Sequence, residues 1–218
     1  MQYEIKYDPF PAVVCTLQPG EQIVAEGGGM SWMDDAFAME TRSGGVGKAF
    51  SKALSGESMF QNVFTATRAG SIAFSSCFPG TILPIRIVPG HDLIVQKGAF
   101  LACEAGVELS MSVNKKLSAG LLGGEGFIMQ RLSGSGIAFL EVDGSVVSRT
   151  LAAGERLVVS SGNVLGFVDG VGYDVELVKG AKNMFLGGEG LANTILTGPG
   201  NVWLQTMPRS ALLAMAAR

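Results

Sequence analysis

The sequence repeats one pattern of turn and strand three times. In each copy a turn containing glycine is followed by a short apolar run. The three copies are Leu17–Ala25, Ile87–Val95 and Leu151–Val159. Their turn glycines, Gly20, Gly90 and Gly154, recur at intervals of 70 and 64 residues. A period of this length indicates one supersecondary unit that is used three times.

A second marker, a Gly-Glu dipeptide, keeps nearly the same period. Gly56-Glu57, Gly124-Glu125 and Gly188-Glu189 recur at intervals of 68 and 64 residues. Each unit is too small to bury its apolar face alone, so the copies must pack on one another. We therefore predict a single domain, 1–218, built of three repeats and a short C-terminal tail. The repeats span about 17–74, 87–139 and 151–203, and the tail spans 208–218.

The residues within each unit follow the pattern of strands and turns. Val107–Val113 and Tyr173–Val178 alternate between apolar and polar side chains, so one face of each strand is expected to be buried. Glycine-rich turns join pairs of apolar runs downstream of every Gly-Glu dipeptide. We expect an all-β fold, a sandwich or barrel with three internal repeats about a pseudo-threefold axis.

Two further features recur once in each unit. A Lys/Ala/Leu stretch before each Gly-Glu dipeptide predicts one or two helical turns that end at a glycine. These stretches are Lys48–Leu54, Lys115–Leu122 and Lys179–Leu186. An aromatic residue also recurs in the last strand, at Phe74, Phe139 and Trp203, and we expect all three to pack in the core rather than form a binding platform.

The composition favours an assembly and argues against a nucleic-acid partner. Charged residues make up 16% of the chain and hydrophobic residues 47%, with a mean hydropathy of +0.34. Soluble chains carry about 25% charged residues, so part of this surface is expected to be covered by other subunits. The net charge of -3 and the pI of about 5.2 give no overall electrostatic attraction for a phosphate backbone.

The cysteines and the N-terminal residues favour a reduced, cytoplasmic setting. Cys15, Cys77 and Cys103 are odd in number and share no CxxC spacing, so we expect three reduced core residues. Met1–Tyr7 alternates like a strand and has no apolar run of a secretion signal. The apolar tail Ala211–Ala217 is too short to span a bilayer.

The sequence offers no recognisable catalytic constellation. Its one histidine, His91, follows Pro89-Gly90 in a turn, whereas a metal site on a β scaffold needs several converging ligands. The stretch Ser43–Ala49 resembles a phosphate loop, but it lacks the first glycine and the hydroxyl that would bind magnesium. We therefore expect no enzymatic activity, no cofactor and no resident metal.

The repeated glutamates Glu57, Glu125 and Glu189 are the strongest candidates for a ligand site. Threefold pseudosymmetry could bring their carboxylates near one axis, where they would attract a hard cation such as calcium or magnesium. Alternatively, each carboxylate accepts hydrogen bonds from nearby backbone N–H groups and fixes its own turn. We favour the structural role and keep the ligand role as the alternative.

The Gly-Glu-Gly elements, the glycine-turned strand pairs after them and the Pro-Gly-Glu hairpins together resemble a known family. It is the altered-inheritance-of-mitochondria family, named in yeast and with many bacterial and archaeal members, and the resemblance covers Tyr3 to about Met207. It implies a homo-oligomer with a fold similar to the tryptophan RNA-binding attenuation protein (TRAP-like), in the double-stranded β-helix class. Eukaryotic relatives are linked to mitochondrial inner-membrane organisation, and the family provides no catalytic residues to transfer.

These observations lead to one functional expectation and one alternative. We expect a non-enzymatic oligomeric β scaffold, a trimer or a multiple of three, that offers a surface to other proteins or to a membrane. The alternative is a module that binds a small ligand or a divalent metal through the repeated Gly-Glu elements.

Overall fold

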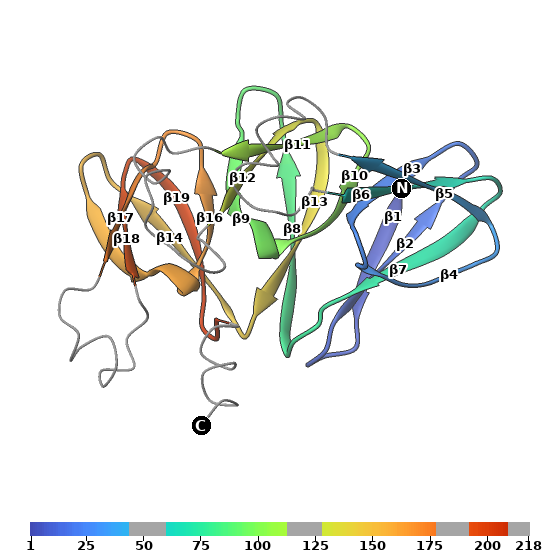
Figure 1. The fold of residues 1–218 in the computed structure, drawn as a ribbon, viewed down its shortest axis with the longest axis horizontal. Coiled ribbons are helices and arrows are strands. Elements are labelled where there is room, and N and C mark those ends of the chain that lie inside the picture. The colour runs from blue at the N-terminus through green and yellow to red at the C-terminus, as the bar shows by residue number, and fades with distance from the viewer. Residues whose placement is uncertain (44–59, 113–127, 178–191, 209–218) are drawn as a thin grey trace.

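The computed structural model describes residues 1–43, 60–112, 128–177 and 192–208, and these residues form an all-β fold (Figure 1). Their two helical elements are single 3-10 turns, η1 (Lys97–Ala99) and η2 (Ser161–Asn163). The predicted helical turns before the Gly-Glu dipeptides lie outside the described residues, as does the tail from residue 209.

We divide the strands that follow β1 (Gln2–Lys6) into three units of six. Unit 1 contains β2 (Ala12–Leu17), β3 (Gln22–Glu26), β4 (Met30–Met33), β5 (Phe37–Ser43), β6 (Phe60–Ala66) and β7 (Gly70–Ser75). Unit 2 contains β8 (Gly80–Ile87), β9 (Leu93–Gln96), β10 (Phe100–Glu104), β11 (Val107–Ser112), β12 (Met129–Gly134) and β13 (Gly136–Asp143). Unit 3 contains β14 (Val146–Leu151), β15 (Arg156–Ser160), β16 (Val164–Val168), β17 (Gly172–Leu177), β18 (Ala192–Thr197) and β19 (Gly200–Gln205).

Strand pairing follows one scheme in all three units, and every pairing is antiparallel. The first and third strands flank the sixth, and the second and fourth flank the fifth. In unit 1, for example, β2 and β4 flank β7, while β3 and β5 flank β6. Each unit therefore contributes two three-stranded half-sheets. The units begin one strand earlier than the repeats that were predicted from the sequence.

Consecutive units share a sheet. β3 of unit 1 pairs with β10 of unit 2, and β9 of unit 2 pairs with β16 of unit 3. The result is two six-stranded sheets in the middle, a four-stranded sheet β1-β2-β7-β4 at one end and a three-stranded sheet β15-β18-β17 at the other. Figure 1 shows them in a row along the long axis, with β4 at the right and β17 and β18 at the left.

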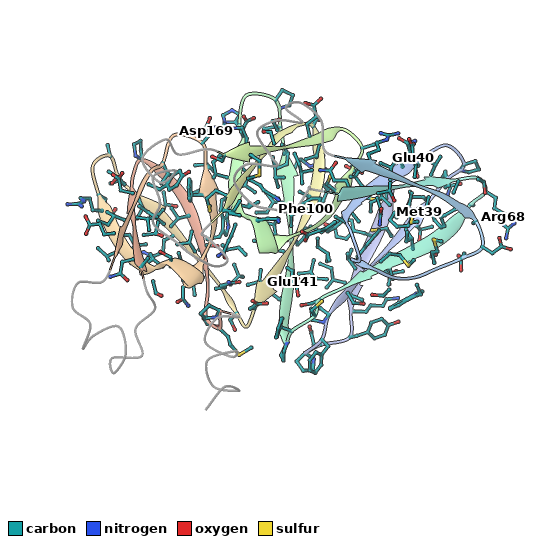
Figure 2. The ribbon with its side chains drawn as sticks, viewed as in Figure 1. Met39, Glu40, Arg68, Phe100, Glu141 and Asp169 are labelled. Carbon is teal, nitrogen blue, oxygen red and sulfur yellow. The ribbon has the colours of Figure 1, made fainter. Side chains whose placement is uncertain are left out.

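Three hydrophobic cores fill the spaces between the four sheets. Core 1 includes Phe64 and Phe74 and lies between the four-stranded sheet and the first six-stranded sheet. Core 2, which contains Phe100, lies between the two six-stranded sheets, near the middle of the molecule in Figure 2. Core 3 contains Phe167 and lies against the three-stranded sheet. Each six-stranded sheet thus has a hydrophobic core against each of its faces.

The glycines that mark the sequence pattern are required by the turn conformation. Gly20, Gly90 and Gly154 have φ values of 87°, 81° and 76°, a region in which a side chain is strained. In two of these turns the next residue also fixes the backbone, because Glu21 Oε2 accepts a hydrogen bond from the N–H of Gln18 at 2.8 Å and Glu155 Oε2 accepts one from the N–H of Ala152 at 2.8 Å. These glutamates have the role that the sequence suggested for the downstream glutamates.

The structure corrects two expectations about the core. Cys15 and Cys103 are buried, and burial raises the pKa of each thiol to about 12, but Cys77 is exposed in the β7–β8 connection. All three are free. The prediction that Phe74 is equivalent to Phe139 and Trp203 is also wrong.

Pairing registers show the correct alignment of these aromatic residues. Phe139 and Trp203 pair with Ala102 and Gly166, whereas Phe74 pairs with Met30, which matches the pairs Phe100–Leu140 and Val164–Leu204. The residue of unit 1 that matches Phe139 and Trp203 is therefore Ala73. Because side chains alternate along a strand, this shift of one residue places Phe74 on the opposite face of its sheet.

Candidate interaction surface

The residues that the sequence singled out do not form a described site. Glu57, Glu125 and Glu189 all lie outside the described residues, so their structural and ligand roles both remain predictions. His91 is exposed in its turn, where its backbone N–H donates a hydrogen bond to the carbonyl of Val88 at 3.0 Å. Within the described ranges, no group of three or more His, Cys, Asp or Glu side chains is placed to hold a metal ion.

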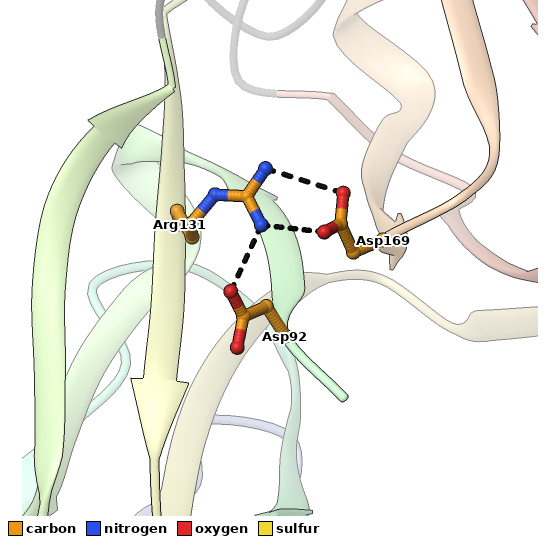
Figure 3. A network of polar contacts seen from close by, with 3 residues as sticks. All are labelled: Asp92, Arg131 and Asp169. Carbon is orange, nitrogen blue, oxygen red and sulfur yellow. Dashed lines mark hydrogen bonds and ion pairs between the residues drawn. The ribbon is translucent and has the colours of Figure 1, made fainter. Parts of the chain in front are cut away.

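The polar network in Figure 3 joins units 2 and 3. Arg131 on β12 contacts Asp92, which precedes β9, and Asp169, which follows β16. The Nη1–Oδ2 distances are 2.9 Å to Asp92 and 2.7 Å to Asp169, and Nη2 donates to the second Asp169 oxygen at 3.2 Å. The hydrogen bonds that Arg131 donates lower the pKa of Asp169. Donation to Asp169 and, to a smaller extent, to Asp92 raises the pKa of Arg131.

This network is a clamp between two units rather than a ligand site. The guanidinium is occupied by two carboxylates, and the backbone N–H of Asp169 also donates to the carbonyl of Asp92 at 2.9 Å. These contacts continue the β9–β16 pairing beyond its last paired residues. The side chains retain 34%, 23% and 52% exposure for Arg131, Asp92 and Asp169, so solvent weakens the interaction.

A buried carboxylate fixes the connection between units 1 and 2. Glu141 on β13 is 6% exposed, and Figure 2 shows it near the middle of the molecule. Its Oε1 accepts hydrogen bonds from Ser76 Oγ and from the N–H of Cys77, both at 2.7 Å. Because a buried carboxylate requires such partners, these contacts hold the chain where it leaves β7.

The surface feature that most suggests a function is the apolar surface of the four-stranded sheet. Eleven large hydrophobic side chains are exposed among the described residues, and six of them belong to this sheet or to the β1–β2 turn. They are Tyr3, Ile5, Tyr7, Phe10, Trp32 and Met33. Tyr7 and Trp32 contact each other, with ring centroids 6.1 Å apart. The pairing registers place Tyr3, Ile5 and Met33 on the face of core 1 and Trp32 on the opposite face, so the sheet exposes apolar side chains on both of its faces and at both of its edges. Exposed apolar side chains concentrated on one sheet are typical of an interaction surface.

The two ends of the row of sheets also carry unpaired edges. Within the described ranges β4 pairs with β7 alone, and β15 pairs with β18 alone. Val158 on β15 is 62% exposed, more than any other large hydrophobic residue that the structure describes. Trp32, Met33 and Val158 are not indicated by the pattern of charged and nucleophilic residues in the sequence. The one signal for Val158 is its spacing from the turn glycine, which is the same as that of the apolar Val24 and Ile94.

The described strands place this chain among all-β proteins that are built of several antiparallel sheets. The family model described as mitochondrial biogenesis AIM24 matches residues 3–207, and the chain belongs to this family. The family resemblance seen in the sequence is thereby confirmed.

A solved structure has the same fold. The crystal structure of protein SPYM3_0169 from Streptococcus pyogenes aligns with a TM-score of 0.80 and 24% sequence identity, covering 100% of this chain and 98% of that chain. At this identity the likeness concerns the fold alone. No curated protein matches the sequence. In the part of the chain that the structure describes, no helix has the length and apolar character needed to cross a membrane.

Proposed function

We propose that this protein is a non-enzymatic, homo-oligomeric β scaffold whose four-stranded sheet is a binding surface for proteins, including copies of itself. The observation that carries the proposal is the concentration of six exposed apolar side chains on one end sheet. Soluble monomers rarely expose so many large apolar side chains on one sheet, because covering them removes apolar area from solvent.

Composition and strand pairing support the same proposal. Only 16% of the residues are charged, which is few for a chain whose whole surface is exposed to water. The common pairing scheme of the three units favours a TRAP-like repeat with pseudo-threefold character. Closed symmetric assemblies are the rule among homo-oligomers, and we propose a ring of three copies or a multiple of three.

A protein partner fits this surface better than a membrane does. Anionic leaflets attract clusters of lysine and arginine, whereas this chain carries a net charge of -3. Co-sedimentation with vesicles of phosphatidylcholine and phosphatidylserine tests the membrane alternative. We expect the protein to stay in the supernatant, and recovery in the vesicle pellet would favour the membrane.

Light scattering at micromolar concentration tests the assembly. We expect a mass that is a multiple of the 22.7 kDa chain. Trp32→Ser should lower that mass, while Met111→Ser, which changes a residue of similar exposure on β11, should not. A 22.7 kDa particle for the unmodified protein would contradict the proposal.

A further inference from the structure

The junction between units is built twice inside the chain in the same way. In each case the second strand of one unit pairs antiparallel with the third strand of the next. The first junction pairs Ala25 with Ala102 and Val24 with Cys103. The second pairs Val95 with Gly166 and Ile94 with Phe167.

The two end sheets each contain a strand that matches one side of these junctions. β15 is the second strand of unit 3, and β4 is the third strand of unit 1. Both are unpaired on the side that the junctions use, within the described part of the chain. They belong to the sheets at opposite ends of the row in Figure 1, so they do not meet in one chain.

A shared irregularity aligns the third strands of the units residue by residue. Pairing with the sixth strand shifts between Phe100 and Ala102, between Val164 and Gly166, and between Met30 and Trp32. Trp32 therefore matches Ala102 and Gly166, and Met33 matches Cys103 and Phe167. The turn glycines align the second strands in the same way, so that Val158 matches Val24 and Ile94.

Residues at matched positions are buried where a junction forms within the chain and exposed where none does. Cys103 and Phe167 are 0% and 1% exposed, but Met33 is 36% exposed. Val24 and Ile94 are 9% and 2% exposed, but Val158 is 62% exposed. Met33 and Val158 are thus exposed at positions that the internal junctions bury.

Side-chain sizes at the junction are complementary. Small Ala102 lies opposite Phe139, and Gly166 lies opposite Trp203. At Gly166 a Cβ atom would come within 2.7 Å of the Ile94 carbonyl oxygen, so this position has little space. In unit 1 the sizes are exchanged, because Trp32 lies opposite Ala73.

The pair of Trp32 with Ala73, in which the large and the small residue are exchanged, indicates where the Trp32 side chain would lie in a third junction. Phe139 belongs to unit 2, yet it is fully buried in core 1 of the preceding unit, with its ring 5.0 Å from that of Tyr3. Trp32 would reach core 3 of another copy in the same way. One aromatic ring would then enter the preceding unit at every junction.

The two edges differ in how far charges protect them against pairing: β4 carries no charged residue or proline, and the one charge of β15 lies at its first residue, away from Val158 and Val159. Each of the six other edge strands carries a charged residue or proline, which discourages pairing with another chain. Examples are Glu4 and Lys6 on β1, Pro84 and Arg86 on β8, and Asp174 and Glu176 on β17.

We propose that β15 of one copy pairs antiparallel with β4 of a second copy, head to tail, with Val158 opposite Met33 and Val159 opposite Trp32. The combined sheet runs β17-β18-β15 and then β4-β7-β2-β1 of the second copy. Such a contact joins two different surfaces, so repeated addition closes a ring or extends a filament. This inference rests on the proposed homo-oligomer and specifies the surfaces that form it.

Disulfide cross-linking tests the pairing directly. In a Cys77→Ser background, Met33→Cys and Val158→Cys are prepared as separate proteins, because directly opposed residues on paired strands come close enough for a disulfide. Mixing the two under mild oxidation should give a cross-linked dimer on a non-reducing gel, and neither protein alone should do so. A mixture of Met111→Cys and Val158→Cys is the control and should remain uncross-linked.

Light scattering of the same proteins separates this inference from the proposed function. Assembly without the mixed cross-link, or cross-linking of one variant with itself, would overturn the β15–β4 pairing and leave the homo-oligomer standing. A monomer would overturn both.

A charged substitution gives an independent readout. Val158→Asp should raise the dissociation constant of the assembly at least about 100-fold, because the carboxylate would be buried without a partner. Far-UV circular dichroism should remain unchanged, since residue 158 is exposed in the single chain. Met111→Asp should leave the constant unchanged, and equal effects of the two variants would contradict the pairing.

Discussion

The six-stranded sheets and the end sheets are built from the same half-sheets, but they differ in what covers them. A six-stranded sheet has a core on each face, so neighbouring residues on one strand can both be apolar. On β3, for example, Ile23 lies in core 1 and Val24 in core 2. On the end sheets the outer face has no core of this chain against it, yet Trp32 and Val158 are apolar there too.

The edge strand β15 has the apolar pattern of an inner strand. A strand with one face in water normally alternates between apolar and polar side chains, and continuous apolar runs are typical of strands buried on both faces. In β15 the run Leu157, Val158 and Val159 has the inner pattern in an outer position. The edge strand β15 therefore has the character of an inner strand without its neighbour.

The largest effect should separate a filled junction from an open one. Phe139→Ala should lower the free energy of unfolding by about 3–5 kcal/mol, because it leaves a cavity in core 1. Trp32→Ala, measured in the monomeric Val158→Asp background, should cost under about 1 kcal/mol, since this ring is 44% exposed. Urea unfolding monitored by circular dichroism gives both values.

If Trp32→Ala lowered the free energy of unfolding as much as Phe139→Ala, the Trp32 ring would already be packed within one chain as the Phe139 ring is. The comparison between inner and outer sheets would then fail.

The clamp between units 2 and 3 should contribute less, and its contribution should depend on pH. Arg131 lowers the folded-state pKa of Asp169, so the stabilisation is present above the unfolded pKa and is lost as pH falls through the folded value. Arg131→Ala should raise the pKa of Asp169, measured by carboxyl NMR titration. The cost at neutral pH should be under about 1 kcal/mol because Asp169 is half exposed.

Arg86→Ala provides the matched control for this clamp, because Arg86 is an exposed arginine on β8 without a described ion pair to Asp169. It should leave the titration of Asp169 unchanged. An unaltered titration in Arg131→Ala as well would contradict the role assigned to the clamp.

The strands and turns were predictable because their signals are local. Alternation in Val107–Ser112 and the left-handed turn glycines depend on a few neighbouring residues, so an all-β fold follows from the sequence. Pairing between units has no local signal. Arg131 and Asp169 are 38 residues apart, and nothing in their surroundings in the sequence indicates that they meet. The equivalence assigned to Phe74 failed for a related reason, since alignment by composition does not detect a shift of one residue.

The candidate surface could be predicted only in part. The repeat aligns Val158 with Val24 and Ile94, which are apolar residues at the two junctions inside the chain. The exposure of Val158 depends on unit 3 being the last unit in the row, which is a property of the whole chain rather than of β15. Cys77 likewise became exposed because it lies in the β7–β8 connection rather than in a strand.

The smallest effect is expected for divalent cations. If the surfaces, rather than a ligand, define the function, millimolar calcium or magnesium should leave the melting temperature unchanged, because a cation raises it only by binding the folded state. Glu57→Gln, Glu125→Gln and Glu189→Gln should each behave like the unmodified protein in this respect. A rise of several degrees that is lost in any one of them would favour the ligand role of the repeated glutamates.

Hydrogen exchange tests most directly the central claim, that the edge strands β4 and β15 pair with each other between copies. At concentrations where the protein is assembled, peptides covering residues 30–33 and 156–160 should exchange as slowly as those covering β3 and β10, because backbone N–H groups of a paired edge are protected. That protection should disappear in Val158→Asp. Fast exchange at both edges in the assembled, unmodified protein would contradict the account.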